Sequence, residues 1–426
     1  MNRATPASVS AADPPAADTR RTSRVPLVAL CVTEITSWGV LYYAFPVLAP
    51  AIGRDTGWST GATTAAFSAA LVVAALGGIP LGRLLDRRGP HLPMTGGSIL
   101  AVLAVLGLAT APNLAWFTAA WLLAGVAMTA VLYQPAFAAL TRYHAPDHVR
   151  ALTTLTLVAG LASTVFAPLT SALAAHHNWR TVYLTLAAVL AAITIPLHHL
   201  ALRRPWPPPP TTDHGPDDQP AGQASGQTGH VMRSRPFLLL ATALTLSAFA
   251  MYAVLINLIP LLTSRGASDT TAAWALGLGG IGQVAGRLGY ANLTRRTSVR
   301  VRTTAILALS AVTTAALAAI PGPVVLLIAV AVLAGTTRGI STLLQATAVS
   351  DRWGTTAYGT LSGALAAPIT IAGAIAPAAG AALAGHLGGY PTLFTALAAT
   401  SALAAAATIG STPPRPATSS RRTHPG

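Results

Sequence analysis

Three charged side chains fall inside long apolar stretches of this 426-residue chain, and their chemistry needs an explanation first. Glu34, the only glutamate, lies nine residues beyond the start of an apolar stretch at Val25. Arg287 and Arg338 lie inside two later stretches. A carboxyl in apolar surroundings can hold and release a proton, and the planar guanidinium of arginine suits a carboxylate or a phosphate. These residue types therefore indicate proton transfer and anion binding as candidate chemistry.

Three interpretations of these charges remain open. Glu34 could carry a proton, the two arginines could hold an anion, or Glu34 could pair with either arginine and tie two helices together. A charge at the centre of a bilayer costs about 2.5–3.5 kcal/mol, so such residues usually have a task. Arg338 lies ~16 Å inside its predicted helix, too deep for its head to reach the interface easily. Arg287 lies about two turns from the end of its helix, where snorkelling to the interface is an alternative.

The segments that must position these residues are membrane-spanning helices. Only 9% of the residues are charged and 53% are hydrophobic, whereas a soluble domain has roughly 25% charged residues. A spanning helix needs about 20 apolar residues, and the apolar runs and loop residues predict twelve of them. The predicted spans are 25–50, 61–83, 92–112, 114–140, 150–175, 180–202, 236–262, 271–292, 301–320, 324–349, 356–384 and 390–410. We therefore expect an all-α integral membrane protein, and a soluble enzyme is excluded.

The spans group into two six-helix bundles, 25–202 and 236–410, joined by a Pro-, Gly- and Gln-containing linker at 203–235. Residues 1–24 and 411–426 are predicted to form cytoplasmic tails, the first of them disordered. All 26 basic residues are arginine, and with the N-terminus inside, 21 of them fall on cytoplasmic segments and three outside. This positive-inside pattern predicts that both termini are cytoplasmic and that the loops contact membrane lipids. It excludes nucleic acid as a partner, because a DNA-binding protein gathers its arginines on one face.

The two halves repeat each other in order. Gly82-Arg83-Leu84 returns as Gly286-Arg287-Leu288, Ala124-Gly125 as Ala334-Gly335 and Ala167-Pro168 as Ala376-Pro377, at offsets between 204 and 210 residues. Parallel repeats of six spans are a transporter architecture in which the substrate site lies between the halves, near the bilayer midplane.

A loop between the second and third spans carries a family resemblance. Gly82-Arg83-Leu84-Leu85-Asp86-Arg87-Arg88-Gly89-Pro90 is similar to the signature G-x-L-x-D-R-x-G-R of the major facilitator superfamily, with Pro90 replacing the final Arg. The chain resembles this family over nearly all of 25–410. The resemblance implies that Asp86 helps to latch one access state near a helix N-terminus of the other half. The residue types alone predict a tight turn at Gly89, with Arg87 and Arg88 at the lipid headgroups. Gly82, Asp86, Arg87, Arg88 and Gly89 are thus a predicted conformational latch.

A narrower resemblance is to the monocarboxylate and oxalate/formate transporters. Tyr43-Ala44-Phe45-Pro46 in the first span looks like the Y-x-F-P of that branch. Gln283-x-x-x-Arg287 matches the context of an arginine that binds the substrate carboxylate there. Two positions depart from the animal members, which have an acid at the place of Gln283 and a lysine at the place of Val47. Proton coupling through that particular pair is therefore not implied.

Other polar residues extend the faces that carry the charges. Glu34, Trp38 and Tyr42 recur four residues apart on one helical stripe, and Gln345 lies on the same stripe as Arg338. We expect Tyr42, Gln345 and Asn257 to face a central cavity as further substrate-binding residues.

Several motifs do not support other functions. Gly277-x-Gly279-x-x-Gly282 has the spacing of a dinucleotide-binding loop but lies inside an apolar span, so close helix packing through Gly282-x-x-x-Gly286 is the better explanation. The adjacent pair His198-His199 does not have a metal-ligand spacing and is expected to be solvated at a span end. No nucleotide-binding P-loop occurs, so nothing indicates an ATP-driven pump, a cofactor or a metal site.

The sequence therefore predicts a twelve-span secondary transporter, not an enzyme, that functions as a monomer. Its predicted substrate is a small organic anion such as a carboxylate, held by Arg287 and Arg338, with Glu34 linking transport to protonation. The alternatives are an exporter of drugs or secondary metabolites and, less favoured, a non-transporting sensor or scaffold. The arginine-rich, lysine-free composition suggests a bacterial cytoplasmic membrane as the location.

Overall fold

A computed structural model describes residues 16–144, 148–206, 229–353 and 358–412, and every regular element in these ranges is a helix. Ten helices are long and apolar enough to cross a membrane. They are accompanied by the shorter apolar helix Thr60–Leu76 and by the 28-residue helix Asp269–Arg296. All twelve predicted spans coincide with a helix or a pair of helices, which is consistent with the expected twelve-span protein.

The first half of the chain contains ten α-helices and one π-helical turn in the described residues. They are α1 (Ala16–Trp38), η1 (Gly39–Tyr43), α2 (Ala44–Thr56), α3 (Thr60–Leu76), α4 (Gly78–Arg88), α5 (His91–Ala109), α6 (Leu114–Val131), α7 (Tyr133–Tyr143), α8 (His148–Ala159), α9 (Ala162–Ala174) and α10 (Trp179–Ala201). The first predicted span thus comprises three helical pieces, and three others (61–83, 114–140 and 150–175) comprise two each. Helix α1 begins at Ala16, nine residues before the expected start of the first span.

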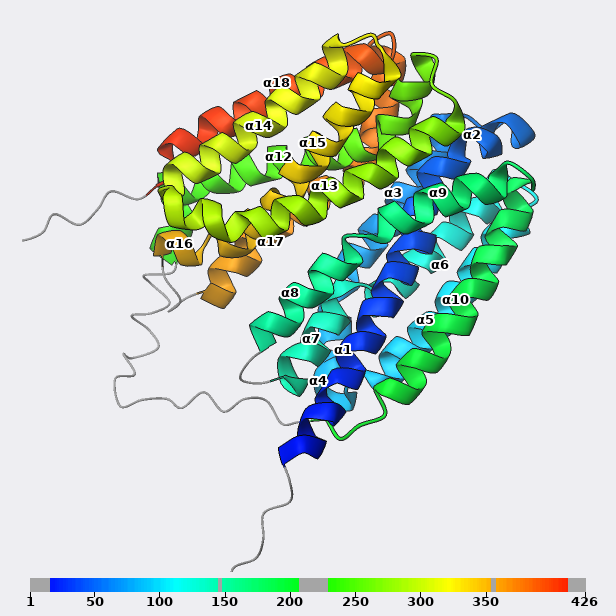
Figure 1. Ribbon diagram of the computed structural model, residues 1–426, viewed down its shortest axis with the longest axis vertical. Helices are drawn as coiled ribbons and strands as arrows, with labels where there is room; N and C mark the ends of the chain where they lie inside the picture. The colour runs from blue at the N-terminus through cyan, green and yellow to red at the C-terminus, as the bar shows by residue number, and fades with distance from the viewer. Residues whose placement is uncertain (1–15, 145–147, 207–228, 354–357, 413–426) are drawn as a thin grey trace, which may run out of the picture.

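The second half has fewer interruptions. Its helices are α12 (Arg235–Ser264), α13 (Asp269–Arg296), α14 (Val299–Ala319), α15 (Val324–Thr347), α16 (Ser350–Trp353), α17 (Tyr358–His386) and α18 (Tyr390–Ala407), followed by the 3₁₀ turn η2 (Thr408–Gly410). Figure 1 shows these helices as one bundle and α1 to α10 as another. Residues 1–15, most of the predicted linker (207–228) and 413–426 lie outside the described residues.

Side-chain caps explain where many of these helices begin. A serine or asparagine oxygen accepts a hydrogen bond from the backbone N–H three residues on at the start of six helices. Such a bond satisfies one of the donors that a helix start leaves free. The capping residues are Ser59, Asn113, Asn178, Ser234, Ser268 and Ser298. The span boundaries are therefore encoded locally, beside the apolar pattern.

The two halves meet through α3 with α17 and through α9 with α13. The Thr164 hydroxyl donates to the Gly277 carbonyl at 2.8 Å, and the Ala378 N–H donates to the Ser68 hydroxyl at 2.9 Å. Arg54 pairs with Asp269 at 3.2 Å beside these contacts. All three contacts lie in the halves of their spans that the predicted topology places towards the outer side of the membrane, or in the adjoining outer loops.

The closest backbone approach of the described helices in the second half is between α13 and α15, and it uses glycine on both. A Cβ on Gly335 would overlap the backbone of Gly279, and one on Gly339 would overlap the backbone of Gln283. Gly282 and Gly286 of α13 face the backbone of α15 equally closely. Small residues allow two membrane helices to pack backbone to backbone. The predicted packing role of Gly282 and Gly286 is therefore confirmed, and it fixes the spacing of the helices that carry Arg287 and Arg338.

Substituting Gly339 by alanine tests this packing. We expect Gly339→Ala to lower the free energy of unfolding by about 1–3 kcal/mol, because the added methyl group meets backbone that cannot move cheaply. Gly289→Ala on α13 is the matched control, since a Cβ added at Gly289 meets no neighbouring atom within 4 Å. Thermal denaturation of the purified variants should separate the two. An equal melting temperature for both would contradict the close packing.

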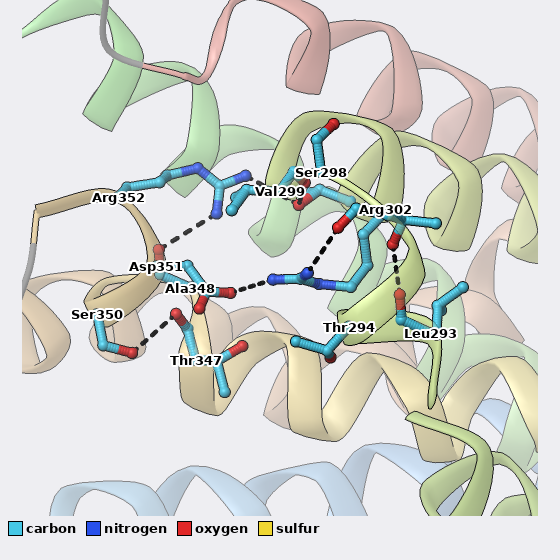
Figure 2. Close-up of polar contacts among 12 residues, drawn as sticks. Leu293, Thr294, Ser298, Val299, Arg302, Thr347, Ala348, Ser350, Asp351 and Arg352 are labelled. Carbon is cyan, nitrogen blue, oxygen red and sulfur yellow. Dashed lines mark hydrogen bonds and ion pairs between the residues drawn. The ribbon is translucent and has the colours of Figure 1, made fainter. Parts of the chain in front are cut away.

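At the predicted cytoplasmic end of the second half, Arg302 links α14 to α16 (Figure 2), and Arg352 links α16 to Ser411, which follows η2. Arg302 of α14 is 2% exposed and pairs with Asp351 of α16. Arg352 donates to the Ser411 carbonyl at 3.1 Å and to the Thr303 hydroxyl at 2.9 Å. Burial lowers the pKa of Arg352 to about 10, and the neighbouring Asp351 carboxylate partly offsets this effect. Asp351 is thus the counter-charge for the buried guanidinium of Arg302 and the half-buried one of Arg352.

Removing that counter-charge should cost stability. We expect Asp351→Asn to lower the free energy of unfolding by about 3 kcal/mol, the low end for a broken buried pair, because Asp351 is partly exposed. Asp269→Asn breaks the exposed pair with Arg54 and should cost less than about 1 kcal/mol. Denaturation of both variants in the same detergent provides the comparison. A similar loss for both would show that the Asp351 cluster contributes no special stability.

Candidate functional site

A cavity of about 310 Å³ lies between the two halves. One wall comes from the first half, with Trp38 of α1, Tyr42 of η1 and Tyr133 of α7. The opposite wall comes from α12, α15 and α17, which contribute Tyr252, Gln345 and Gly373 respectively, among others. A substrate in this cavity would contact both halves at once.

Packed aromatic rings form the first-half wall of the cavity. The Trp38 ring centroid lies 5.3 Å from that of Tyr42 and 5.2 Å from that of Tyr133. Tyr42 in turn contacts Phe67 of α3 with a centroid distance of 5.3 Å. Edge-to-face and tilted contacts at these distances are favourable for aromatic pairs. The wall is therefore a rigid surface rather than a set of mobile side chains.

Glu34 lies one helical turn before Trp38 and is fully buried. The side chain of Trp38 is the one hydrogen-bond partner described for its carboxylate. The Tyr42 hydroxyl, on the same stripe, is buried without a partner among the described residues. No ion pair joins Glu34 to Arg287 or Arg338 among the described residues. The structural ion pair considered from the sequence is therefore not formed in this conformation.

The helix that carries Glu34 changes its winding directly after Trp38. Residues Gly39–Tyr43 form a single π-helical turn within an otherwise continuous apolar helix. A Cβ on Gly39 would overlap the ring of Phe166 on α9, so glycine permits the contact between these helices. Single π turns occur frequently at functional sites. The π turn sets the direction in which the Tyr42 side chain projects. The apolar pattern of the sequence does not predict this turn.

Arg287 reaches across from α13 to the first half. Its side chain is buried, and one terminal N–H donates to the Thr156 carbonyl in the last turn of α8. The span is interrupted there, because α8 ends at Ala159 and α9 begins at Ala162. A cation is favoured at such a helix C-terminus. The Arg287 Nε atom has no partner among the described residues, so the guanidinium is only partly satisfied.

Arg338 is held less firmly than Arg287. Its terminal N–H group lies 3.4 Å from the Gln283 side-chain oxygen, and its Nε atom is buried without a described partner. Part of the side chain borders a second cavity of about 30 Å³ between α12, α13, α14 and α15. The guanidinium is also near enough to influence the phenols of Tyr42 and Tyr252, which line the large cavity. Arg338 therefore borders the small cavity of the second half, and its Nε group is a donor without a described partner.

Of the other three residues predicted to face the cavity, two line it and one does not. Tyr42 and Gln345 line the large cavity. Asn257 is not among the described residues that line either cavity. Its side-chain amide donates a hydrogen bond to the Ala253 carbonyl at 2.9 Å and packs against Gly380 of α17. Within the described residues no group of three His, Cys, Asp or Glu side chains could hold a metal ion.

The latch motif ends α4, as the turn chemistry predicts. Gly89 has φ of +71°, a left-handed conformation that favours glycine, and Arg87 and Arg88 are exposed in the last helical turn. The Asp86 side chain lies outside what the structure describes. No heavy atom lies within 4 Å of a Cβ built on Gly82, so its packing does not require glycine here.

The expectation that His198 is solvated is wrong. His198 is fully buried in the first half, with its ring nitrogens 2.7 Å from the Ser98 hydroxyl and 3.0 Å from the Thr33 hydroxyl. Its neighbour His199 is exposed and lies 3.2 Å from His91. Successive residues of an α-helix point about 100° apart, so His198 faces the interior of the bundle while His199 faces outward.

A family model described as Major Facilitator Superfamily matches residues 30–377. The chain belongs to the Major Facilitator Superfamily. Membership makes it a multi-pass membrane protein that acts as a secondary transporter of a small molecule, rather than an enzyme. The resemblance drawn from the loop signature and the internal repeat is thereby confirmed.

Two curated relatives match this superfamily member in part. An uncharacterised 38 kDa protein encoded in the 23S RNA operon of Thermoproteus tenax is 32% identical over 155 residues, which are 36% of this chain and 40% of that protein. Monocarboxylate transporter 13 of Bos taurus is 28% identical over 216 residues, which are 50% of this chain and 47% of that protein. The matched stretches therefore span less than half of either relative.

Solved structures agree with the fold over nearly the whole chain. A variant of the nucleoside transporter NupG has a TM-score of 0.67 at 13% identity and covers 91% of this chain and 99% of that one. A bacterial homologue of the human lysosomal transporter Spinster, inward-facing and occupied, has a TM-score of 0.66 at 17% identity and covers 90% and 93%. At these identities the likeness establishes the major facilitator fold alone.

The lack of an ion pair at Glu34 has a measurable consequence for stability. We expect Glu34→Leu to leave the free energy of unfolding unchanged or to raise it by about 1–3 kcal/mol, because it removes a buried carboxyl group that no described basic residue pairs with and fills its place with an apolar side chain. His198→Leu is the matched control and should be destabilising, since it leaves the Ser98 and Thr33 hydroxyls without their partner. A loss of about 3–5 kcal/mol in Glu34→Leu would instead indicate a buried ion pair. Thermal denaturation in one detergent measures both variants.

Proposed function

We propose that this transporter carries a small organic anion, most simply a monocarboxylate, through the cavity between its halves. One observation carries the proposal. Within the described residues, Arg287, Arg338 and Glu34 each carry a buried polar atom without a hydrogen-bond partner, and the elements that carry Glu34 and Arg338 also contribute Trp38 and Gln345 to the cavity wall. Buried polar groups in proteins are nearly always hydrogen-bonded, so these groups together need an occupant.

Charge balance favours a negative occupant. Two guanidinium groups lie in the membrane interior, and the one glutamate in that region pairs with neither of them in the described structure. An unpaired charge in a low-dielectric environment is costly. A carboxylate can accept hydrogen bonds from both free edges of an arginine and would offset that cost. Arg287, Arg338, Tyr42 and Gln345 are the proposed substrate ligands, with Asn257 as a packing residue that could join them only after a rearrangement.

Glu34 is the proposed proton carrier. It stands on the stripe that leads through Trp38 to Tyr42, next to the cavity, and no described arginine holds it as a permanent anion. A carboxyl that is free to change its protonation can move a proton together with the substrate. The Bos taurus relative is named a monocarboxylate transporter, and Gln283-x-x-x-Arg287 resembles the corresponding motif, which supports the choice of substrate class.

The remaining sequence predictions fit this proposal. We propose that both termini are cytoplasmic, that the bundles 25–202 and 236–410 move as units about the linker 203–235, and that one chain suffices for transport. The conformation described here would then be closed at the outside, where Arg54 meets Asp269, and the Gly82–Gly89 loop would latch the alternative state.

An exporter of drugs or secondary metabolites is the second candidate. The observation in its favour is the aromatic wall of the cavity, which suits a large apolar compound. The arginines distinguish the two functions, because a neutral or cationic compound gains nothing from them.

Arginine variants test the anion site. We expect a panel of carboxylates to raise the melting temperature of the wild type, and Arg338→Gln and Arg287→Gln to lose that shift. A ligand at about 100 times its dissociation constant adds ~2.7 kcal/mol, which is enough to detect. Arg54→Gln, at the exposed outer pair, is the control and should keep the response. Stabilisation of both arginine variants by a cationic or neutral drug, with no effect of carboxylates, would contradict the proposal and favour the exporter.

A further inference from the structure

We infer that the substrate is a carboxylate with a ring or a comparably bulky apolar body, and that the aromatic cavity binds this body while the arginines bind the carboxylate. The inference deepens the proposed function and rests on it for the carboxylate end. For the apolar end it rests on the size of the cavity, the composition of its wall and one glycine.

The cavity is large for a minimal carboxylate. A single ordered water needs about 10–15 Å³ of the same kind of space, and the cavity offers about 310 Å³. Acetate or oxalate would leave most of this volume to water. A phenyl or cyclohexyl group attached to a carboxylate would occupy it and exclude water from the anion site.

The wall offers ring faces and ring edges rather than charges. Trp38, Tyr42 and Tyr133 approach the cavity from the first half, and Tyr252 approaches it from the second. Aromatic side chains interact favourably with other rings through offset and edge-to-face contacts.

The positive charges lie outside the described lining of the cavity. Arg338 acts electrostatically on the phenols of Tyr42 and Tyr252, and Arg287 acts on those of Tyr133 and Tyr252. Neither arginine is among the described residues that line the cavity itself. A ligand that fills the aromatic cavity and also reaches an arginine therefore needs an apolar body and a separate anionic end.

Gly373 of α17 sets the width of the cavity opposite the first-half wall. It lines the cavity, and a Cβ added to it would lie 2.8 Å from Cδ2 of the Tyr252 ring. A methyl group at this position would have to push the Tyr252 ring aside, into the space that a substrate ring would use. Gly373 is thus a position that should discriminate between substrates of different width.

Calorimetric titration of the purified protein in nanodiscs tests the inference. The probes are phenylacetate, acetate and phenylacetamide, which separate the ring from the charge. We expect phenylacetate to bind at least about tenfold more tightly than either acetate or phenylacetamide, because each of the latter lacks one of the two recognised features. Gly373→Ala and Trp38→Ala should each reduce the ratio of phenylacetate affinity to acetate affinity by about tenfold.

Two variants serve as matched controls. Gly363→Ala lies on the same helix as Gly373, but no neighbouring atom lies within 4 Å of its added Cβ. Trp274→Ala removes a half-exposed tryptophan of α13 that is not among the described cavity residues. Both should keep the wild-type ratio of affinities.

The possible results separate this inference from the proposed function. Acetate that binds as tightly as phenylacetate would overturn the bulky-substrate inference and leave the anion transporter intact. Phenylacetamide that binds as tightly as phenylacetate, in a manner sensitive to Trp38, would overturn the anion site and leave a ring pocket. An unchanged ratio in Gly373→Ala would remove that residue from the substrate pocket, and absence of binding by all three probes would overturn both proposals.

Discussion

Three ionisable side chains in the membrane interior lack a full set of hydrogen-bond or ion-pair partners, and the rest of the structure has to accommodate them. Glu34, Arg287 and Arg338 each leave at least one buried polar atom without a partner among the described residues. Such atoms are costly in hydrocarbon, where no water offsets the loss. Arg287 donates to a backbone carbonyl of the other half, and the elements that carry Glu34 and Arg338 also contribute residues to the wall of the cavity between the halves. The same groups would destabilise a membrane protein that had no substrate to bind.

The remainder of the architecture positions these groups with backbone features rather than with large side chains. Glycines bring α13 and α15 into backbone contact, so that Arg338 meets Gln283. The break between α8 and α9 exposes the Thr156 carbonyl that receives Arg287. The π turn after Trp38 turns Tyr42 towards the cavity. Interrupted helices are tolerated at membrane depth only where they are buried in protein or line a cavity, and both interruptions face the interior of the protein.

Much of this fold could be predicted from the sequence because its determinants are local. Apolar run length and Ser or Asn caps place the spans, as at Ser268 before α13. The ordered repeat and the 82–90 loop identify the family. The identities of the buried charges were also predictable, since Glu34 and Arg338 stand out in apolar runs. Their partners were not, because contacts such as Arg287 with Thr156 join residues 131 positions apart. His198 and Asn257 show the same limit, since a helical pattern does not reveal which neighbour faces each side chain.

The proposed function couples the binding of a carboxylate to the uptake of a proton by Glu34. Calorimetric titration of the carboxylate in two buffers with different heats of ionisation measures this uptake directly, because the difference in apparent binding enthalpy reports the protons exchanged. The account predicts that carboxylate binding to the wild type takes up a proton near neutral pH and that Glu34→Gln still binds but takes up none. Identical binding enthalpies in both buffers for the wild type, or an uptake that persists in Glu34→Gln, would contradict it.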